Sequence, residues 1–222
     1  MSGLFDPLNL ATRIPIVLLA LTVHEFAHAY AAYRLGDPTA FRQGRCTLNP
    51  LKHLDPLGTV CLMFAPIGWA KPVPVNLQNF DDPRRGDLIT SAAGPGSNVV
   101  QAVIFALLLR AVIYWAGHGA MDTPRSALMV EAMFRMFQIA VLINVGLAVF
   151  NCLPIYPLDG FHITLQLTRP ENQQRFMDTA HYGPFVIIGL VVLSGVAGVD
   201  ILGALIHPPA DLLFEYVAGI KF

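Results

Sequence analysis

The sequence predicts an all-α polytopic membrane protein with about four transmembrane helices. Of its 222 residues, 55% are hydrophobic and only 13% are charged, and the mean hydropathy is +0.55. A soluble globular domain carries about 25% charged residues, so this chain has too little charge to cover a surface that faces water. Four apolar segments also reach the length of about 20 residues that a helix needs to cross a bilayer.

The four predicted spans are separated by polar loops and turn residues. They comprise residues 8–35, 88–116, 127–153 and 183–206. A fifth apolar stretch, at 57–69, is too short to span and is interrupted by Pro66 and Gly68. We expect it to enter and leave the membrane on the same side, as a re-entrant or half-inserted piece that protein or water must cover.

Two segments between the first and second spans have strand character, at residues 40–48 and 69–77. In the second, Pro72 and Pro74 alternate with other residues. Proline cannot donate a hydrogen bond to a sheet, so this segment is predicted to be an edge strand or an extended linker. We expect a small membrane-associated β-sheet here, whose edge could accept an extended peptide as an added strand.

Basic residues predict the orientation of the spans. Residues 34–87 hold seven Lys and Arg, and the loop after the third span adds Arg169 and Arg175, whereas the opposite side has Arg125 and Lys221. By the positive-inside rule, the two basic loops face the cytoplasm and both termini face outward.

No repeat or linker divides the chain, which is predicted to form one domain over residues 1–222. It has a core at about 8–168, the extra C-terminal span at 183–206, and a tail at 208–222 that we expect to lie at the membrane interface. The N-terminus has no basic region of a signal peptide, so the first apolar segment is expected to be retained. The net charge of −1 argues against a nucleic-acid partner.

The sharpest chemical motif is His24-Glu25-Phe26-Ala27-His28, within the first predicted span. Positions i and i+4 of a helix lie on one face, so both imidazoles could bind one Zn²⁺ at about 2.0–2.1 Å. Glu25 is then placed to take a proton from a water molecule that the metal activates. The alternative is a set of polar contacts between helices, but ionisable groups are costly inside a membrane unless a partner compensates them.

A catalytic zinc usually has three protein ligands, and Asp159 is the best candidate for the third. Pro154 and Pro157 break the helix just past the third span, and Gly160 permits a tight turn. Asp159 would follow the cytoplasmic end of that span, at the depth expected for the two histidines. It could instead cap a helix over residues 160–167.

The sequence at this point resembles the site-2 protease family of intramembrane metalloproteases. The family's motifs occur in order as HEFAH, GWAKPVPVN, AGPGSN and NCLPIYPLDG, and the resemblance runs from about residue 14 to 168. It implies a three-helix catalytic core, one zinc ion held by His24, His28 and Asp159, and Glu25 as general base. It also implies a minimal form of the family, without a PDZ or other regulatory domain.

The resemblance also suggests that Asn98 and Asn151 help to hold the substrate backbone or to steady the transition-state oxygen, although either could simply bond between helices. His53 and His162 are noted as histidines without an assigned role.

The expected activity is cleavage of peptide bonds in transmembrane segments of single-span substrates, within regulated intramembrane proteolysis. The expected location is a prokaryotic cytoplasmic membrane, with the site nearer the cytoplasmic side. A membrane metal-ion transporter is the main alternative, but it should distribute ligands along two or more spans. A catalytically inactive homologue that binds membrane segments is the other.

Overall fold

The computed structural model describes residues 7–55, 58, 70–118, 123–196 and 201–220, and these are mostly helical. The all-α prediction is therefore confirmed. Within the described residues no strand pairs into a sheet, and the nearest approach to one is an isolated antiparallel bridge between Leu54 and Ala70.

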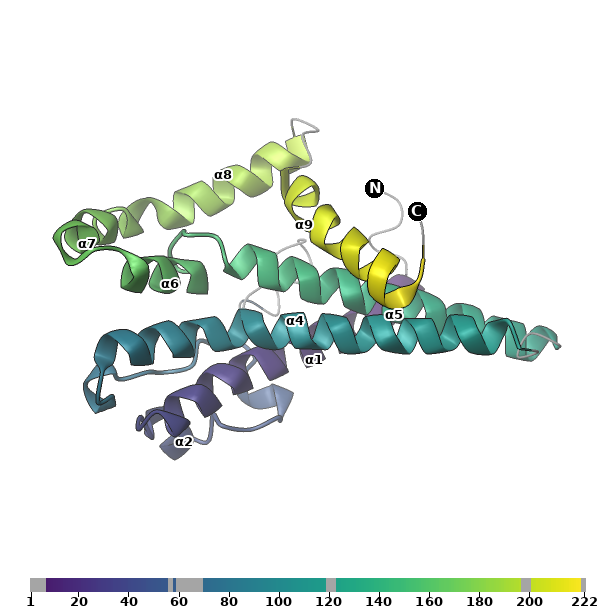
Figure 1. The fold of residues 1–222 in the computed structure, drawn as a ribbon, viewed down its shortest axis with the longest axis horizontal. Helices are drawn as coiled ribbons and strands as arrows, with labels where there is room; N and C mark the ends of the chain where they lie inside the picture. Colours follow the sequence, from purple (N-terminus) through teal and green to yellow (C-terminus); the bar gives the residue numbers. More distant parts are fainter. Residues whose placement is uncertain (1–6, 56–57, 59–69, 119–122, 197–200, 221–222) are drawn as a thin grey trace. The chain divides into compact units, whose positions relative to one another are not determined.

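Three helices are long and apolar enough to cross a membrane: α1 (Pro7–Arg34), α4 (Pro83–Ala116) and α5 (Pro124–Asn151). They match the first three predicted spans (Figure 1). Helix α4 begins at Pro83, ahead of the predicted start at residue 88. Proline is favoured in the first turn of a helix, because its missing N–H would have no intrahelical partner there. The predicted start was based on hydrophobic residues, so it left out the polar first turn of the helix.

The fourth predicted span, residues 183–206, corresponds to two helices in the structure. Helix α8 (Gly183–Val196) has 14 residues and α9 (Ile201–Leu212) has 12, and residues 197–200 lie outside the described part of the chain. Fourteen residues rise about 21 Å, which is less than the hydrocarbon thickness of about 30 Å. The fourth span therefore stays a prediction.

The strand predicted at residues 40–48 is wrong. This segment contains the helical turn α2 (Thr39–Arg42), followed by Gly44 with φ 67°. Glycine adopts this left-handed backbone readily and a strand does not contain it. Residues 71–76 carry no regular secondary structure, in agreement with the linker alternative, and the predicted re-entrant segment at 57–69 lies outside the described residues apart from residue 58.

The chain forms two compact units. The first unit is drawn from Met1–Ala20, Asn98–Val149 and Asp200–Phe222, and the second from Leu21–Ser97 and Phe150–Val199. The prediction of one domain is not decided by this division, because α1, α4 and α5 each continue from one unit into the other.

The first unit holds the main apolar core, where α4 and α5 pack against α9 and the π-helix η4 (Leu213–Ala218). Small side chains allow these helices to approach closely. The tail that was predicted to lie at the membrane interface has one exposed face, which carries Asp211 and Glu215. Its opposite face packs into this core. The buried members of the core are Ala102, Ala106, Leu109, Val141, Val145, Ala210, Phe214 and Ala218.

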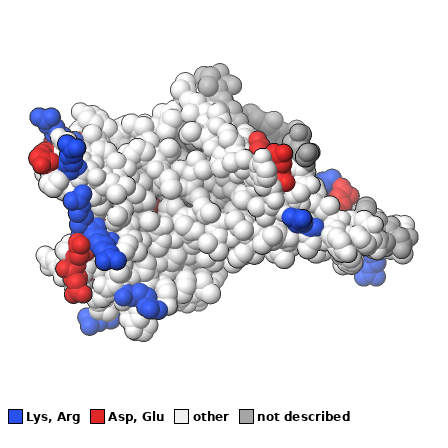
Figure 2. All heavy atoms as spheres, viewed as in Figure 1, with Lys and Arg blue, Asp and Glu red and all other residues white. Residues whose placement is uncertain are grey.

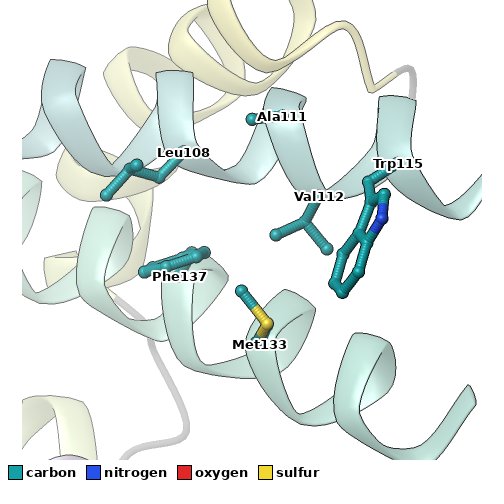
Figure 3. A pocket seen from close by; sticks show the side chains of 6 residues that line it. All are labelled: Leu108, Ala111, Val112, Trp115, Met133 and Phe137. Carbon is teal, nitrogen blue, oxygen red and sulfur yellow. The ribbon is translucent and has the colours of Figure 1, made fainter. Parts of the chain in front are cut away.

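An apolar hollow of about 280 Å³ lies between α4 and α5 in the first unit. Figure 3 shows the indole of Trp115 at one end of it, with Met133 and Phe137 of α5 facing Val112 of α4. The lining side chains carry no charge. This apolar surface of α4 and α5 is compatible with contact with lipid hydrocarbon, as expected for membrane-spanning helices.

The second unit contains His24, Glu25, His28 and Asp159 and is built from short elements around segments of α1 and α4. Its charged side chains gather, in the face that Figure 2 shows, at the end that carries α2 and α7, and the surface beyond them is nearly uncharged. Besides parts of α1, α4 and α5 and all of α2 and α8, it comprises η1 (Pro50–Lys52), η2 (Leu77–Asn79), α6 (Asp159–Leu167), α7 (Pro170–Met177) and η3 (Ala180–Tyr182).

The carboxylate of Asp37 ties the end of α1 to the segment around η2. Its Oδ1 accepts hydrogen bonds from the backbone N of Thr39 at 3.0 Å and from Nδ2 of Asn79 at 2.6 Å, and its Oδ2 accepts from the backbone N of Asn76 at 2.8 Å. Burial acts to raise the pKa of Asp37, but the bonds from Thr39, Asn76 and Asn79 outweigh it and hold the pKa below its usual value.

Replacing Asp37 with Asn should destabilise the protein, because the amide cannot accept at both positions. Charge-assisted hydrogen bonds contribute roughly 1.5–3 kcal/mol each, and we expect a loss of about that size in the free energy of unfolding in detergent micelles. Since the folded pKa is depressed, the stabilisation is present above the unfolded pKa of about 3.9 and is lost as the pH falls through the folded pKa. The exposed Asp211→Asn is the matched control, and equal stability of both variants at pH 7 would contradict this role.

Candidate metal centre

The two motif histidines lie on one face of α1, as their spacing predicts. Their Nε2 atoms are 3.0 Å apart and the rings meet edge to face. His24 is 5% exposed and His28 is 8% exposed, and Glu25 between them is 8% exposed. All three side chains are therefore shielded from solvent within a helix apolar enough to cross a membrane.

Asp159 reaches the same point from the first turn of α6. Its Oδ2 lies 3.2 Å from Nε2 of His24, and its Oδ1 lies 3.3 Å from Nε2 of His28. The helix-cap alternative is not what the structure shows, because the N-cap of α6 is Leu158 and no side chain caps this end. Asp159 thus faces the histidines and completes a group of three side chains that could hold a metal ion.

The backbone before α6 is held close to the end of α5. A Cβ atom on Gly160 would come within 2.3 Å of the carbonyl oxygens of Cys152 and Leu153. Only glycine fits such an approach. The packing of Gly160 therefore fixes where α6 begins, and with it the position of the Asp159 carboxylate.

The donor atoms fit a shared cation. Nδ1 of His28 lies 2.7 Å from the carbonyl oxygen of Thr90, which can only accept, so Nδ1 carries the proton and Nε2 presents its lone pair. Oδ2 of Asp159 is buried, and no hydrogen bond within the described part of the chain satisfies it. A tetrahedral zinc with bonds of about 2.0–2.1 Å would hold its ligand atoms about 3.3 Å apart, which is close to the spacing seen.

Helix α4 approaches the histidines more closely than a side chain would allow. A Cβ atom on Gly94 would lie 2.3 Å from Nε2 of His28 and 2.7 Å from Cε1 of His24. Sequence reasoning assigned no role to Gly94, although a glycine inside an apolar helix is a sign of close packing. The same helix supplies Thr90 one turn earlier, so α4 both orients His28 and closes one side of the site.

Arg84, in the first turn of α4, forms hydrogen bonds with the C-terminal end of α6. Nε of Arg84 donates to the carbonyl oxygen of Gln166 at 2.6 Å, and its Nη2 donates to that of Thr168 at 3.0 Å. These bonds satisfy carbonyl groups that the end of a helix leaves unpaired. Because α6 carries Asp159 at its other end, Arg84 helps to fix the orientation of this carboxylate.

His162 belongs to the same contact between α4 and α6. Oδ2 of Asp87 accepts a hydrogen bond from Nε2 of Gln166 at 2.6 Å and lies 3.4 Å from Nδ1 of His162. The hydrogen bond to the Asp87 carboxylate raises the pKa of His162 above its usual value, against the opposing effect of burial. The structure thus gives His162 a place in the support of α6.

Asn98 and Asn151 occupy different units. Asn98 is fully buried in the first unit, where its Nδ2 donates to Oδ1 of Asn144 at 3.0 Å, and Nδ2 of Asn144 donates to the Ala140 carbonyl at 2.9 Å. This is a hydrogen bond between α4 and α5. Asn151 is half-buried at the last residue of α5, in the second unit. Asn144 was missed, although a polar residue in an apolar helix marks such a contact.

Replacing Gly94 with Ala should displace the histidine rings and weaken metal binding, because the added methyl group overlaps His28. We expect zinc affinity to fall by roughly 10–100-fold, the range found when the surroundings of ligands are altered. Gly96→Ala is the matched control on the same helix, since its Cβ would meet nothing within 4 Å. Zinc content of both purified variants after competition with a chelator measures the difference, and equal retention would show that Gly94 is not required.

Comparison with known proteins places the whole site in a family. Residues 13–193 match Peptidase family M50. The chain is 37% identical over 218 residues to "Putative zinc metalloprotease YwhC" of Bacillus subtilis, covering 98% of this chain and 96% of that protein. It is 32% identical over 185 residues to "Putative zinc metalloprotease Rip2" of Mycolicibacterium smegmatis, covering 79% of this chain and 64% of that protein. No solved structure matches. The chain therefore belongs to peptidase family M50, the site-2 protease family, and is a membrane zinc metalloprotease.

Proposed function

We propose that this protein is an intramembrane endopeptidase that hydrolyses peptide bonds in the transmembrane segments of single-span membrane proteins. One observation carries the proposal: two of the three ligating side chains, His24 and His28, project from α1, which is apolar enough to cross a membrane. A peptide bond that reaches this site lies at membrane depth. Such cleavage would release a membrane-anchored protein, as in regulated intramembrane proteolysis.

His24, His28 and Asp159 would hold the zinc ion, and the Thr90 carbonyl would keep His28 in the binding tautomer. When bound, the ion supplies Lewis acidity that polarises the scissile carbonyl and makes a water molecule more acidic. With three protein ligands, the ligand set leaves a position open for these groups.

Glu25 is the proposed general base. Its carboxylate takes a proton from water as the water oxygen bonds to the carbonyl carbon of the substrate. The same group then gives that proton to the amide nitrogen as the carbon–nitrogen bond breaks. The products are a new carboxyl terminus and a new amino terminus, and Glu25 returns to its starting state. Its burial beside the ligands suits a group that must act out of contact with bulk water.

A helical substrate must unwind before its carbonyl groups can reach the site, because a helix keeps them in internal hydrogen bonds. The irregular segment at residues 71–76, with Pro72 and Pro74, is the proposed place for the opened strand. Asn98 and Asn151 remain the proposed side chains for holding its backbone. For Asn98, this would require the bond to Asn144 to open or to be shared.

The proposed location is the cytoplasmic membrane of a prokaryote, with the site nearer the cytoplasmic side. Support comes from the basic residues around the unit that holds the ligands: Arg34 ends α1, Arg84 and Arg85 begin α4, and Arg175 lies in the last turn of α7. Figure 2 shows such charges gathered at one end of this unit. By the positive-inside rule, these charges support a cytoplasmic position for this end.

A metal transporter is the less favoured reading. Among the residues that the structure describes, the histidines, cysteines and acidic residues form a single group able to bind a metal ion, at His24, His28 and Asp159. A transport path would need successive sites along the membrane. An inactive homologue is disfavoured because both motif histidines, Glu25 and Asp159 are all present.

Replacing Glu25 with Gln should abolish cleavage while leaving zinc bound, since it removes the base but no ligand. We expect a fall in kcat of roughly 10²–10⁴-fold, measured on a co-expressed single-span substrate, with zinc content measured on the purified protein. Asp159→Ala should lose both zinc and activity, and the exposed Glu215→Gln should change neither. Cleavage at the normal rate by the Glu25→Gln protein would reject the mechanism.

A further inference from the structure

A cavity of about 420 Å³ lies between α4, α6, α7 and η3, within the second unit. Its volume is in the range of roughly 300–1,000 Å³ that is usual for ligand pockets. It has no part in the hydrolysis itself, although one of its walls is α6, which carries Asp159 in its first turn. The cavity is therefore a candidate site for a part of the substrate away from the cleaved bond.

The distance of the cavity from the candidate ligands follows from two separate helices. Asp87 lines the cavity and lies about two turns before Gly94, which packs against His28. Gln166 lines it too, donates to Asp87 at 2.6 Å, and lies about two turns after Asp159. Two turns of helix rise about 11 Å, a distance that an extended peptide covers in about three residues. A strand bound at the ligands could therefore bring a side chain about three residues from the cleaved bond to this cavity.

The proposed path of the substrate also leads to the cavity. Leu77 lines it and directly follows the irregular segment at residues 71–76, which is the proposed place for the opened strand. Relative to Gly94, the cavity lies toward the end of α4 that carries Arg84 and Arg85, the proposed cytoplasmic end. The cavity would therefore meet the part of a membrane segment that lies near the cytoplasmic interface.

The apolar walls of the cavity favour an aromatic side chain. The ring of Phe161 packs edge to face against Tyr156, with centroids 5.6 Å apart, and stacks on Phe176 at 4.8 Å. Tyr156 is 41% exposed and Met177 is 49% exposed, so both offer apolar surface to a ligand. A further ring beside Tyr156 would extend this cluster, because aromatic pairs and contacts of sulfur with aromatic rings are favourable beyond the apolar area that they bury.

Two glutamine side chains supply hydrogen-bond acceptors at the cavity. Nε2 of Gln166 donates to Asp87, and Nε2 of Gln173 donates to the Leu165 carbonyl at 3.1 Å. Because these nitrogens are engaged, the amide oxygens are the atoms that could accept from the indole N–H of a tryptophan or the hydroxyl of a tyrosine. Both of these side chains are enriched at membrane interfaces, which is the depth proposed for the cavity.

A lysine or arginine side chain is the alternative occupant, because Asp87 also lines the cavity. Asp87 is only 6% exposed. Its carboxylate already accepts from Gln166 and lies 3.4 Å from Nδ1 of His162. A basic side chain would have to displace these partners, so recognition of a positive charge is disfavoured.

We propose that this cavity is a specificity subsite, which binds an aromatic side chain of the substrate about three residues from the cleaved bond, toward the cytoplasmic end of the membrane segment. The proposal rests on the function proposed above and adds a sequence preference to it. Binding energy gained in the subsite would offset part of the cost of unwinding the substrate and would fix which peptide bond reaches Glu25.

The subsite predicts a preference at one substrate position. The cleaved bond of a single-span substrate is first located by mass spectrometry of the products, and each nearby position on its cytoplasmic side is replaced in turn by Trp, Leu, Ala and Lys. At one of these positions, kcat/KM should be at least roughly 10-fold higher with Trp than with Ala, as expected for an apolar pocket that is filled. Lys should be no better than Ala there.

Filling the cavity should remove this preference. Ala180 lines the cavity from η3, and Ala180→Phe would occupy the space of the substrate side chain. We expect cleavage of the Trp substrate to fall to the level of the Ala substrate, with zinc content and cleavage of the Ala substrate near those of the wild type. Ala132→Phe, at an exposed position of α5, is the matched control and should keep the preference. Met177→Ala removes part of an exposed wall and should lower the preference even if Ala180→Phe does not fold.

Three results would each overturn the subsite: equal cleavage of the Trp and Ala substrates by the wild-type protein, a preference for Lys, or an unchanged preference in both Ala180→Phe and Met177→Ala. Glu25→Gln is tested on the preferred substrate to separate these results from the function itself. If that variant cleaves normally, the proposed function fails. Cleavage that depends on Glu25 but shows no preference for Trp rejects the subsite alone.

Discussion

The second unit is organised around one electrostatic constraint: two buried imidazole nitrogens and a partly buried carboxylate must face each other within 3.3 Å. Because Nδ1 of His28 donates to the Thr90 carbonyl, Nε2 of His28 presents a lone pair toward the carboxylate. A shared cation stabilises this arrangement, which costs free energy without one. The surrounding residues enforce this approach. Gly160 lets α6 begin against the end of α5, Gly94 lets α4 pass beside the histidines, and Arg84 holds the other end of α6. The three candidate ligands are therefore preorganised by backbone packing.

The two units are stabilised in different ways, and the difference suits their tasks. The first unit packs small and apolar side chains of α4 and α5 against α9 and η4, with the bond between Asn98 and Asn144 as a buried polar contact. The second unit is held to a greater extent by side chains that bond to backbone groups far away in the sequence, as Asp37 and Arg84 do. Hydrogen bonds are directional, so such contacts fix the orientation of ligating groups more narrowly than apolar packing does.

The features that follow from local periodicity could be predicted from the sequence. Length and hydropathy located three helices, and the i, i+4 spacing placed His24 and His28 on one face. Asp159 was found because two prolines and a glycine mark a break at the right depth. The strand predicted at residues 40–48 is wrong because the chain turns at Gly44, which adopts a left-handed backbone conformation. Gly94 and Arg84 could not be assigned, since their roles depend on which helices approach each other.

The central claim is that His24, His28 and Asp159 together hold one zinc ion. X-ray absorption spectroscopy at the zinc edge of the purified protein tests it most directly, because it reports the kind and distance of the ligand atoms. We expect two imidazole nitrogens and additional oxygen ligands at about 2.0–2.2 Å, with no sulfur. One imidazole should disappear from the spectrum of any zinc that His28→Ala retains. A spectrum with sulfur at about 2.3 Å, or without imidazole, would contradict the account.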